Sequence, residues 1–153
     1  MEPLVTVLIC TNSLSEELFT SIDSACSQDY KNLLITVLFD GINPTQSTLF
    51  RLNSIFSRYN QSSSYIVESL NIGLTAGLCT LQSHFHSDFY ARLDVGDTWD
   101  SSKISKQIDF ILSNRCSIVG TRSRYLRNGA QLGLGPAIQN DSNLIIDLSL
   151  IHI

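Results

Sequence analysis

Closely spaced cysteines are missing from the sequence. Its four cysteines lie far apart and include no C-x-x-C pair. This scatter argues against a zinc knuckle and against a redox dithiol, because both need sulfur atoms at short, regular spacing. We expect each cysteine to act as a small, buried apolar residue in a reducing compartment.

Long apolar runs and an excess of positive charge are missing too. No stretch approaches the ~18 to 20 apolar residues that span a bilayer, and the start, Met1-Glu2-Pro3, lacks the basic region of a secretory signal. The net charge of -4 offers a polyanion no general attraction. We therefore expect a cytoplasmic protein, at most peripheral to a membrane, that does not bind nucleic acid.

What the sequence does contain is the composition and patterning of a folded α/β domain. Of its 153 residues, 43% are hydrophobic and 16% are charged, which is ordinary for a globular protein. Short apolar runs alternate with segments of helical apolar spacing, the pattern of βαβ units around a mainly parallel sheet. The first run, residues 4–10, is almost unbroken, so we predict a central strand covered on both faces.

The same patterning predicts the other elements. Strands are expected at residues 33–39, 65–67, 88–93 and 117–120, and helices near residues 15–28, 49–59, 73–85 and 101–112. A polar cluster at 61–64 predicts a loop, and the Gly-, Asn- and Ser-rich stretch 128–142 predicts a loop or an incomplete element. The apolar end, 144–153, has no evident partner.

Acidic residues follow two of the predicted strands. Asp40 ends the strand 33–39, and Asp94 and Asp97 follow the strand 88–93. Because ligands bind beyond the carboxyl ends of parallel strands, we expect these side chains to face one crevice. Asp94 and Asp97 suit a divalent ion that also holds phosphate oxygens. On spacing alone, turn and N-cap hydrogen bonds are the more common role for such aspartates, and Asp40-Gly41 is foremost a turn signal.

Several segments resemble, in the right order, the motifs of family 2 glycosyltransferases. The first strand and the following helix with its Q-x-Y-x-N turn are matched by VTVLICTN at 5–12 and SIDSACSQDYKN at 21–32. Further matches are VLFDG at 37–41, NIGLTAGL at 71–78, YARLDVGD at 90–97, KISKQ at 103–107 and IVG at 118–120. The resemblance covers residues 4 to about 125.

This resemblance implies a Rossmann-like GT-A domain that is C-terminally truncated. Residues 1–153 would form one incomplete domain, with a nucleotide-sugar-binding part at 4–125 and an irregular or truncated end at 128–153. The implied activity moves a sugar, with inversion, from a nucleotide-sugar donor to a saccharide or lipid-linked acceptor. By analogy, the pathway is bacterial surface polysaccharide assembly at the inner face of the cytoplasmic membrane.

The resemblance also assigns the nucleotide-binding residues. Asp40 would hydrogen-bond the base or ribose, and Thr11 and Asn12 would lie under the nucleotide. Arg92 would either approach the diphosphate or pair with an acidic neighbour, and a purely structural role for it stays open.

Asp94 and Asp97 would supply the DXD function, with Mn²⁺ or Mg²⁺ as the cofactor. The sequence departs from the family pattern D-x-D-D here, because Gly96 occupies the place of the middle carboxylate. The catalytic base is unknown: Asp141 and Asp147 are the only carboxylates after Asp109, and neither lies in a recognisable motif.

Two other functions remain open from the sequence. The chain could bind a nucleotide sugar or Mg²⁺ without turnover, which would make it a binding module. A nucleotidyltransferase is disfavoured, because the loop after the first predicted strand, residues 11–15, contains neither the glycine nor the basic residue that such enzymes carry there.

Overall fold

The computed structural model describes residues 2–127 and 130–135. The chain divides into two compact units, residues 1–106 and residues 107–153, where the sequence predicted a single domain. The first unit holds all the strands that build the candidate site.

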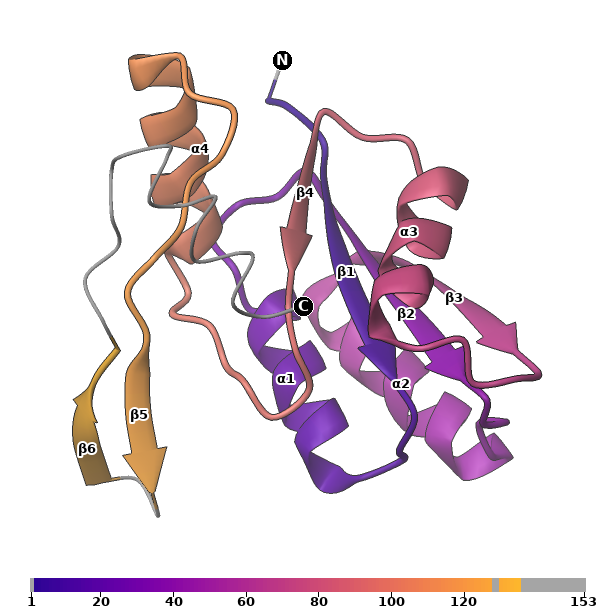
Figure 1. Ribbon diagram of the computed structural model, residues 1–153. Helices are drawn as coiled ribbons and strands as arrows, with labels where there is room; N and C mark the ends of the chain where they lie inside the picture. Colours follow the sequence, from indigo (N-terminus) through magenta and orange to yellow (C-terminus); the bar gives the residue numbers. More distant parts are fainter. Residues whose placement is uncertain (1, 128–129, 136–153) are drawn as a thin grey trace. The chain divides into compact units, whose positions relative to one another are not determined.

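A parallel sheet forms the centre of the first unit (Figure 1). Its four strands are β1 (Val5–Thr11), β2 (Leu33–Asp40), β3 (Ser62–Glu68) and β4 (Phe89–Arg92), in the spatial order β3-β2-β1-β4. β1 pairs in parallel with β2 on one side and with β4 on the other. The prediction of a central first strand in a parallel sheet is confirmed.

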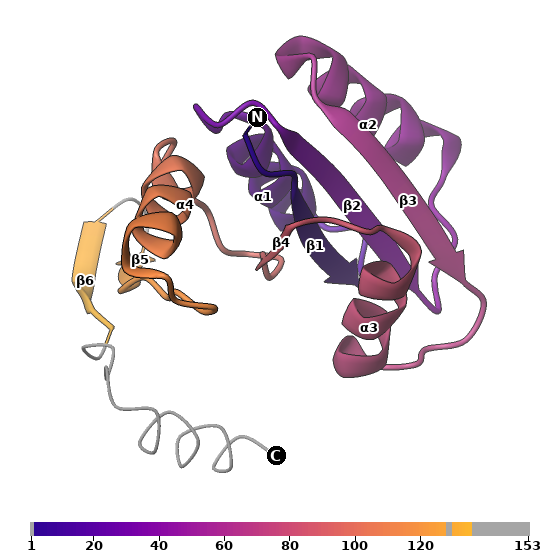
Figure 2. The ribbon, with the colours of Figure 1, turned by 90° about the horizontal axis from the view of Figure 1, so that it is seen from above.

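Helices cover both faces of this sheet. α1 (Glu16–Cys26) and α2 (Gln46–Tyr59) lie on one face, and α3 (Leu74–His84) lies on the other (Figure 2). The chain runs outward from β1 to β3 and then crosses back to β4 on the far side of β1. Because crossovers between parallel strands are right-handed, this reversal of direction moves the connecting helix to the opposite face.

Both faces of the two central strands are buried. Leu8 of β1 and Leu38 of β2 pack with Leu81 of α3 in one cluster. Their neighbours Ile9 and Phe39 are fully buried and, by the alternation of side chains along a strand, face α1 and α2. A strand covered on both faces has no polar side, which explains the nearly continuous apolar runs in the sequence.

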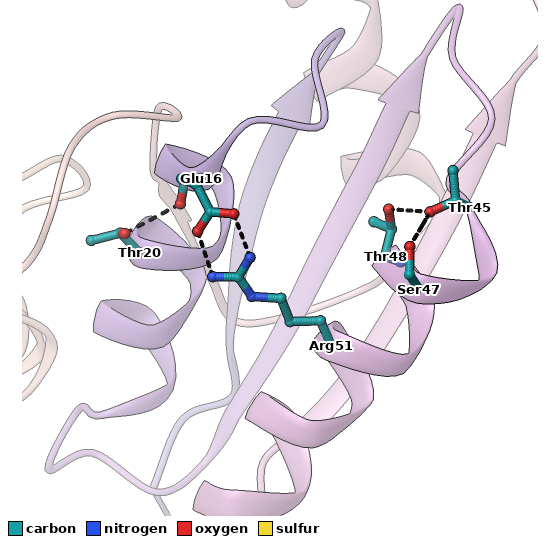
Figure 3. A network of polar contacts seen from close by, with 6 residues as sticks. All are labelled: Glu16, Thr20, Thr45, Ser47, Thr48 and Arg51. Atoms are coloured by element: carbon teal, nitrogen blue, oxygen red, sulfur yellow. Dashed lines mark hydrogen bonds and ion pairs between the residues drawn. The ribbon is translucent and has the colours of Figure 1, made fainter.

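An exposed ion pair joins the two helices on the same face (Figure 3). The guanidinium of Arg51 in α2 donates to both carboxylate oxygens of Glu16 in α1 at 2.6 Å. The carbon atom of the guanidinium also lies 3.9 Å from the ring centroid of Phe19. Exposed pairs of this kind contribute only about 0.2 to 1 kcal/mol. The apolar surface beneath them therefore contributes most of the helix packing.

The structure corrects three sequence predictions. Residues 62–64, predicted as loop, belong to β3, and residues 117–120, predicted as a strand, form none. An antiparallel hairpin of β5 (Arg124–Arg127) and β6 (Ala130–Leu134) occurs in the second unit, so residues 130–134 are not irregular as predicted. Short polar strands lack the apolar alternation on which the prediction relied. Residues 136–153 lie outside the described part.

The last helix, α4 (Lys103–Asn114), starts in the first unit and agrees with the prediction for residues 101–112. Among residues 2–127 and 130–135, no helix has the length and apolar character needed to cross a membrane.

A close approach between α3 and β1 gives a test of this packing. A Cβ atom at Gly77 would lie 2.6 Å from the Sγ atom of Cys10, well inside van der Waals contact. We expect Gly77→Ala to lower the free energy of unfolding by about 1 to 3 kcal/mol, as overpacking does. Urea denaturation followed by circular dichroism measures this. The matched control is Gly77→Ala in a Cys10→Ala background, where the loss should largely disappear; an equal loss in both backgrounds would contradict the contact.

Candidate functional site

The carboxyl ends of β1, β2 and β4 form the candidate site. The strand order reverses on either side of β1, since β2 follows on one side and β4 lies on the other. In open α/β sheets, ligands bind at such a switch point, just beyond the carboxyl ends of the strands. Thr11, Asp40 and Asp94 all lie at this edge, as the sequence predicted.

Asp40 ends β2 with its side chain almost fully buried, the residue being 3% exposed. One carboxylate oxygen accepts the backbone N–H of Ile72 at 2.7 Å, and the other accepts that of Gly73 at 3.0 Å. Gly41 approaches the same loop so closely that a Cβ there would lie 2.7 Å from the backbone nitrogen of Asn71. The Asp-Gly pair thus holds the turn that leads into α3.

The structure therefore gives Asp40 a task that sequence reasoning missed. Two motifs far apart in the chain, Asp40-Gly41 and Asn71-x-Gly73, form one assembly. Each motif is visible in the sequence, as an acidic acceptor and as a glycine-containing turn. That the two motifs contact each other is visible only in the tertiary structure.

The residues after β1 adopt a tight turn. The hydroxyl of Thr11 donates to the carbonyl oxygen of Ser13 at 2.7 Å and accepts the N–H of Ser13 at 3.2 Å. Thr11 is buried, whereas Asn12 is exposed. Of the two predicted residues, Thr11 shapes the turn and Asn12 presents its side chain to solvent.

The segment between β4 and α4, residues 93–102, is named the acidic loop here. At its start, the guanidinium of Arg92 donates two hydrogen bonds of 2.7 Å to the two carboxylate oxygens of Asp94. The Asp94 side chain is 45% exposed, and Asp97 is exposed as well. The hydrogen bond with Asp94 raises the pKa of Arg92, so this guanidinium stays charged. Of the sequence alternatives for Arg92, the structure shows the pairing with an acidic neighbour.

The turn of the acidic loop explains the glycine that departs from the family pattern. The N–H of Asp97 donates to the carbonyl oxygen of Asp94 at 3.1 Å, which closes the turn. Within it, Gly96 has φ +99°, a conformation that side-chain-bearing residues rarely adopt. A carboxylate at position 96 would therefore need a different backbone here.

The thiol of Cys10 lies within the influence of two carboxylates, those of Asp40 and Asp94. Burial, together with the negative charges of Asp40 and Asp94, raises the pKa of the Cys10 thiol to about 11. Cys10 lies near the carboxyl end of β1, between β2 and β4. The carboxylates of Asp40 and Asp94 thus act on the same thiol from the two sides of β1.

The donor atoms at this edge suit one kind of metal ion. The described part of the chain contains no group of three or more His, Cys, Asp or Glu side chains that could hold a metal. Mg²⁺ does not need such a cage, because it commonly binds through one or two carboxylates and takes its other ligands from phosphate and water. The carboxylates of Asp94, whose side chain is 45% exposed, and of Asp97 fit that mode, with Arg92 as a competitor for both oxygens of Asp94.

Two known proteins are similar to this chain in sequence. An uncharacterized glycosyltransferase of Haemophilus influenzae is 31% identical over 112 residues, which are 73% of this chain and 34% of the relative. The putative glycosyltransferase EpsE of Bacillus subtilis is 30% identical over 120 residues, which are 78% of this chain and 42% of the relative.

This chain is a relative of the glycosyltransferases. It spans only 34% and 42% of the length of these two relatives. A scan against protein-family models finds no match.

Solved glycosyltransferase structures share the fold of this chain. The mannosyltransferase PcManGT from Pyrobaculum calidifontis, in complex with GDP-Man and Mn²⁺, has a TM-score of 0.64 at 18% identity, covering 72% of this chain and 33% of that one. S. aureus TarS 1-349, in complex with UDP, has a TM-score of 0.61 at 12% identity, covering 73% and 33%. The prediction of a Rossmann-like fold of the GT-A type is confirmed.

The role of Asp40 can be tested by removing one acceptor oxygen. Asp40→Asn turns an amide group toward one of two backbone N–H donors, so we expect the free energy of unfolding to fall by about 1.5 to 3 kcal/mol. Urea denaturation measures the change. Asp29→Asn, at an exposed position after α1, serves as the control. Equal stability of the two variants would contradict the loop-holding role.

Cys10 serves as a reporter of charge at the site. Because the charge of Asp94 contributes to its raised pKa, Asp94→Asn should lower that pKa and raise the thiolate fraction. We expect iodoacetamide to modify Cys10 about twofold faster at about pH 9 in this variant, and more slowly than the exposed Cys79 in every variant. Peptide mass spectrometry gives both rates. An unchanged Cys10 rate would place Asp94 farther away than the structure does.

Proposed function

We propose that this chain forms the donor site of a glycosyltransferase. A nucleotide sugar binds beyond the carboxyl ends of β1, β2 and β4, and the whole protein transfers its sugar to a hydroxyl of a saccharide or lipid-linked acceptor. One observation supports the proposal: Thr11, Asp40 and Asp94 lie at the carboxyl ends of three strands, at the switch point of a sheet whose fold is shared by solved glycosyltransferases. PcManGT was solved with GDP-Man and TarS with UDP, which supports a nucleotide-linked donor here.

Asn12 would contact the nucleotide directly, whereas Asp40 and Thr11 would support its binding indirectly. Asn12 is exposed beside the end of β1, which suits a direct contact with the nucleoside. Asp40 has little exposed surface and two occupied oxygens, so its larger contribution is to shape the turn at 71–73 beside the base or ribose. Thr11 acts in the same indirect way through the turn after β1.

Asp94, Asp97 and Arg92 serve the diphosphate end. Asp94 and Asp97 would hold Mn²⁺ or Mg²⁺, which when bound neutralises the charge that develops on the leaving nucleoside diphosphate. The Mn²⁺ of the PcManGT complex supports this cofactor. The guanidinium of Arg92 would pair with a phosphate oxygen, since it recognises the oxygens of a phosphate through the same two-donor geometry as those of a carboxylate.

The finer assignments rest on the sequence resemblance. These are membership of family 2, inversion at the anomeric carbon, a role in bacterial surface polysaccharide assembly, and a cytoplasmic setting with peripheral contact to the inner membrane face. No catalytic base is assigned, because Asp141 and Asp147 lie outside the described residues.

Calorimetric titration tests the donor site. UDP, GDP and dTDP are each added to the purified chain with and without Mn²⁺. We expect one nucleotide to bind in a metal-dependent way, and Asp94→Asn and Asp97→Asn each to weaken that binding at least about tenfold. Asp29→Asn, at the amino-terminal edge of the sheet, should bind like the wild type.

The outcomes separate the candidate functions. Metal-dependent binding without sugar transfer to any acceptor would favour the binding module over the enzyme. Absence of binding to all three nucleotides, by a chain that unfolds cooperatively, would contradict the donor-site proposal.

A further inference from the structure

A row of polar side chains interrupts the buried side of α1 and continues just past its end. Ser21 and Gln28 are 0% and 1% exposed, and Ser24 is half-buried between them. At about 100° per residue, positions 21, 24 and 28 fall on one narrow stripe of the helix. Burying polar groups costs free energy unless each is hydrogen-bonded, so their partners identify what this polar stripe does.

All three side chains of the polar stripe bind the backbone of the acidic loop. The hydroxyl of Ser21 accepts the N–H of Gly96 at 3.0 Å and donates to the carbonyl oxygen of Asp97 at 2.8 Å. The hydroxyl of Ser24 accepts the N–H of Trp99 at 3.2 Å. These contacts join residues far apart in the sequence, with separations of 75 and 76 positions.

Gln28 anchors the other end of the loop. Its amide nitrogen donates to the carbonyl oxygen of Asp100 at 2.8 Å, and its amide oxygen accepts the N–H of Ile104 at 3.1 Å. The backbone N–H of Asp29 adds a bond of 2.9 Å to the carbonyl oxygen of Ser101. The acidic loop is therefore tied to α1 and the residues after it, from Gly96 to the first turn of α4.

We infer that the polar stripe of α1 positions the metal-binding carboxylates, with Ser21 as the residue that sets the turn between Asp94 and Asp97. Ser21 holds both the N–H of Gly96 and the carbonyl oxygen of Asp97, so it determines the direction of the chain between the two carboxylates. The inference rests on the proposed donor-site function. Ser21 is a positioning residue, because it contacts the loop backbone and no carboxylate oxygen.

The positive φ of Gly96 gives this contact its importance. A glycine at φ +99° has more accessible conformations than any other residue, so the turn is not held by its own backbone preferences. Its Cβ direction is also open, with no atom within 4 Å. The polar stripe adds a restraint to the single backbone hydrogen bond that closes this turn, and removing it should let the two carboxylates move apart.

Three variants of the full chain test the inference. Ser21→Ala removes both hydrogen bonds, and Ser21→Thr keeps the hydroxyl. Ser27→Ala is the matched control, since the Ser27 hydroxyl donates to the carbonyl oxygen of Ser24, within the same segment. Each variant is first checked by urea denaturation, so that loss of fold is recognised.

The first readout needs no ligand. The amide exchange rate of Gly96, measured by NMR, should rise about tenfold in Ser21→Ala, because its N–H loses its acceptor. It should stay near the wild-type rate in Ser21→Thr and Ser27→Ala. An unchanged Gly96 rate in a folded Ser21→Ala protein would overturn the inference.

The second readout is the Mn²⁺ concentration that half-saturates the chain in the presence of UDP or GDP, measured by Mn²⁺ electron paramagnetic resonance. We expect this concentration to rise about 10- to 100-fold in Ser21→Ala, as for other residues that orient metal ligands, and to recover in Ser21→Thr. An unchanged value in Ser21→Ala beside a wild type that binds Mn²⁺ would overturn the inference alone. Absence of Mn²⁺ binding by the wild type would overturn the donor-site proposal, and with it the metal-positioning role.

Discussion

The parallel pairing of β1 with both β2 and β4 is the constraint on which the rest of this structure depends. Because β1 has a partner on each side, the chain reverses direction around it and the ends of three strands meet at one edge. The same pairing buries both faces of β1 and sends α3 to the face opposite α1 and α2. Site and core are thus two results of one hydrogen-bonding arrangement.

Loops at this edge are held by side chains rather than by their own conformational preference. Asp40 binds the turn before α3, and Ser21 and Gln28 bind the loop before α4. In each case a buried polar side chain hydrogen-bonds backbone N–H or C=O groups of the loop. The positions of these loops are thus set by side chains from other elements.

The charges at this edge also affect their neighbours. Asp94 is matched by Arg92 in the structure, and Cys10 remains a neutral thiol because burial and two nearby carboxylates raise its pKa to about 11. In the proposed donor site, the carboxylate of Asp94 would hold the metal ion and the guanidinium of Arg92 would hold a phosphate oxygen.

The sequence by itself determined the βαβ plan and the central position of β1, because the periodicity of apolar residues indicates which faces are buried. It also placed Asp40 and Asp94 at the carboxyl edge of the sheet, because both follow predicted strands and the strands of a parallel sheet all run in the same direction. It did not reveal β3 beyond 65–67, the hairpin of β5 and β6, or the polar stripe of α1. Short polar strands carry no periodic signal, and Ser21 looks like any helical serine until the acidic loop, 75 residues away, lies against it. Only the tertiary structure decides such long-range partners, because a hydrogen bond between distant segments leaves no trace in local sequence.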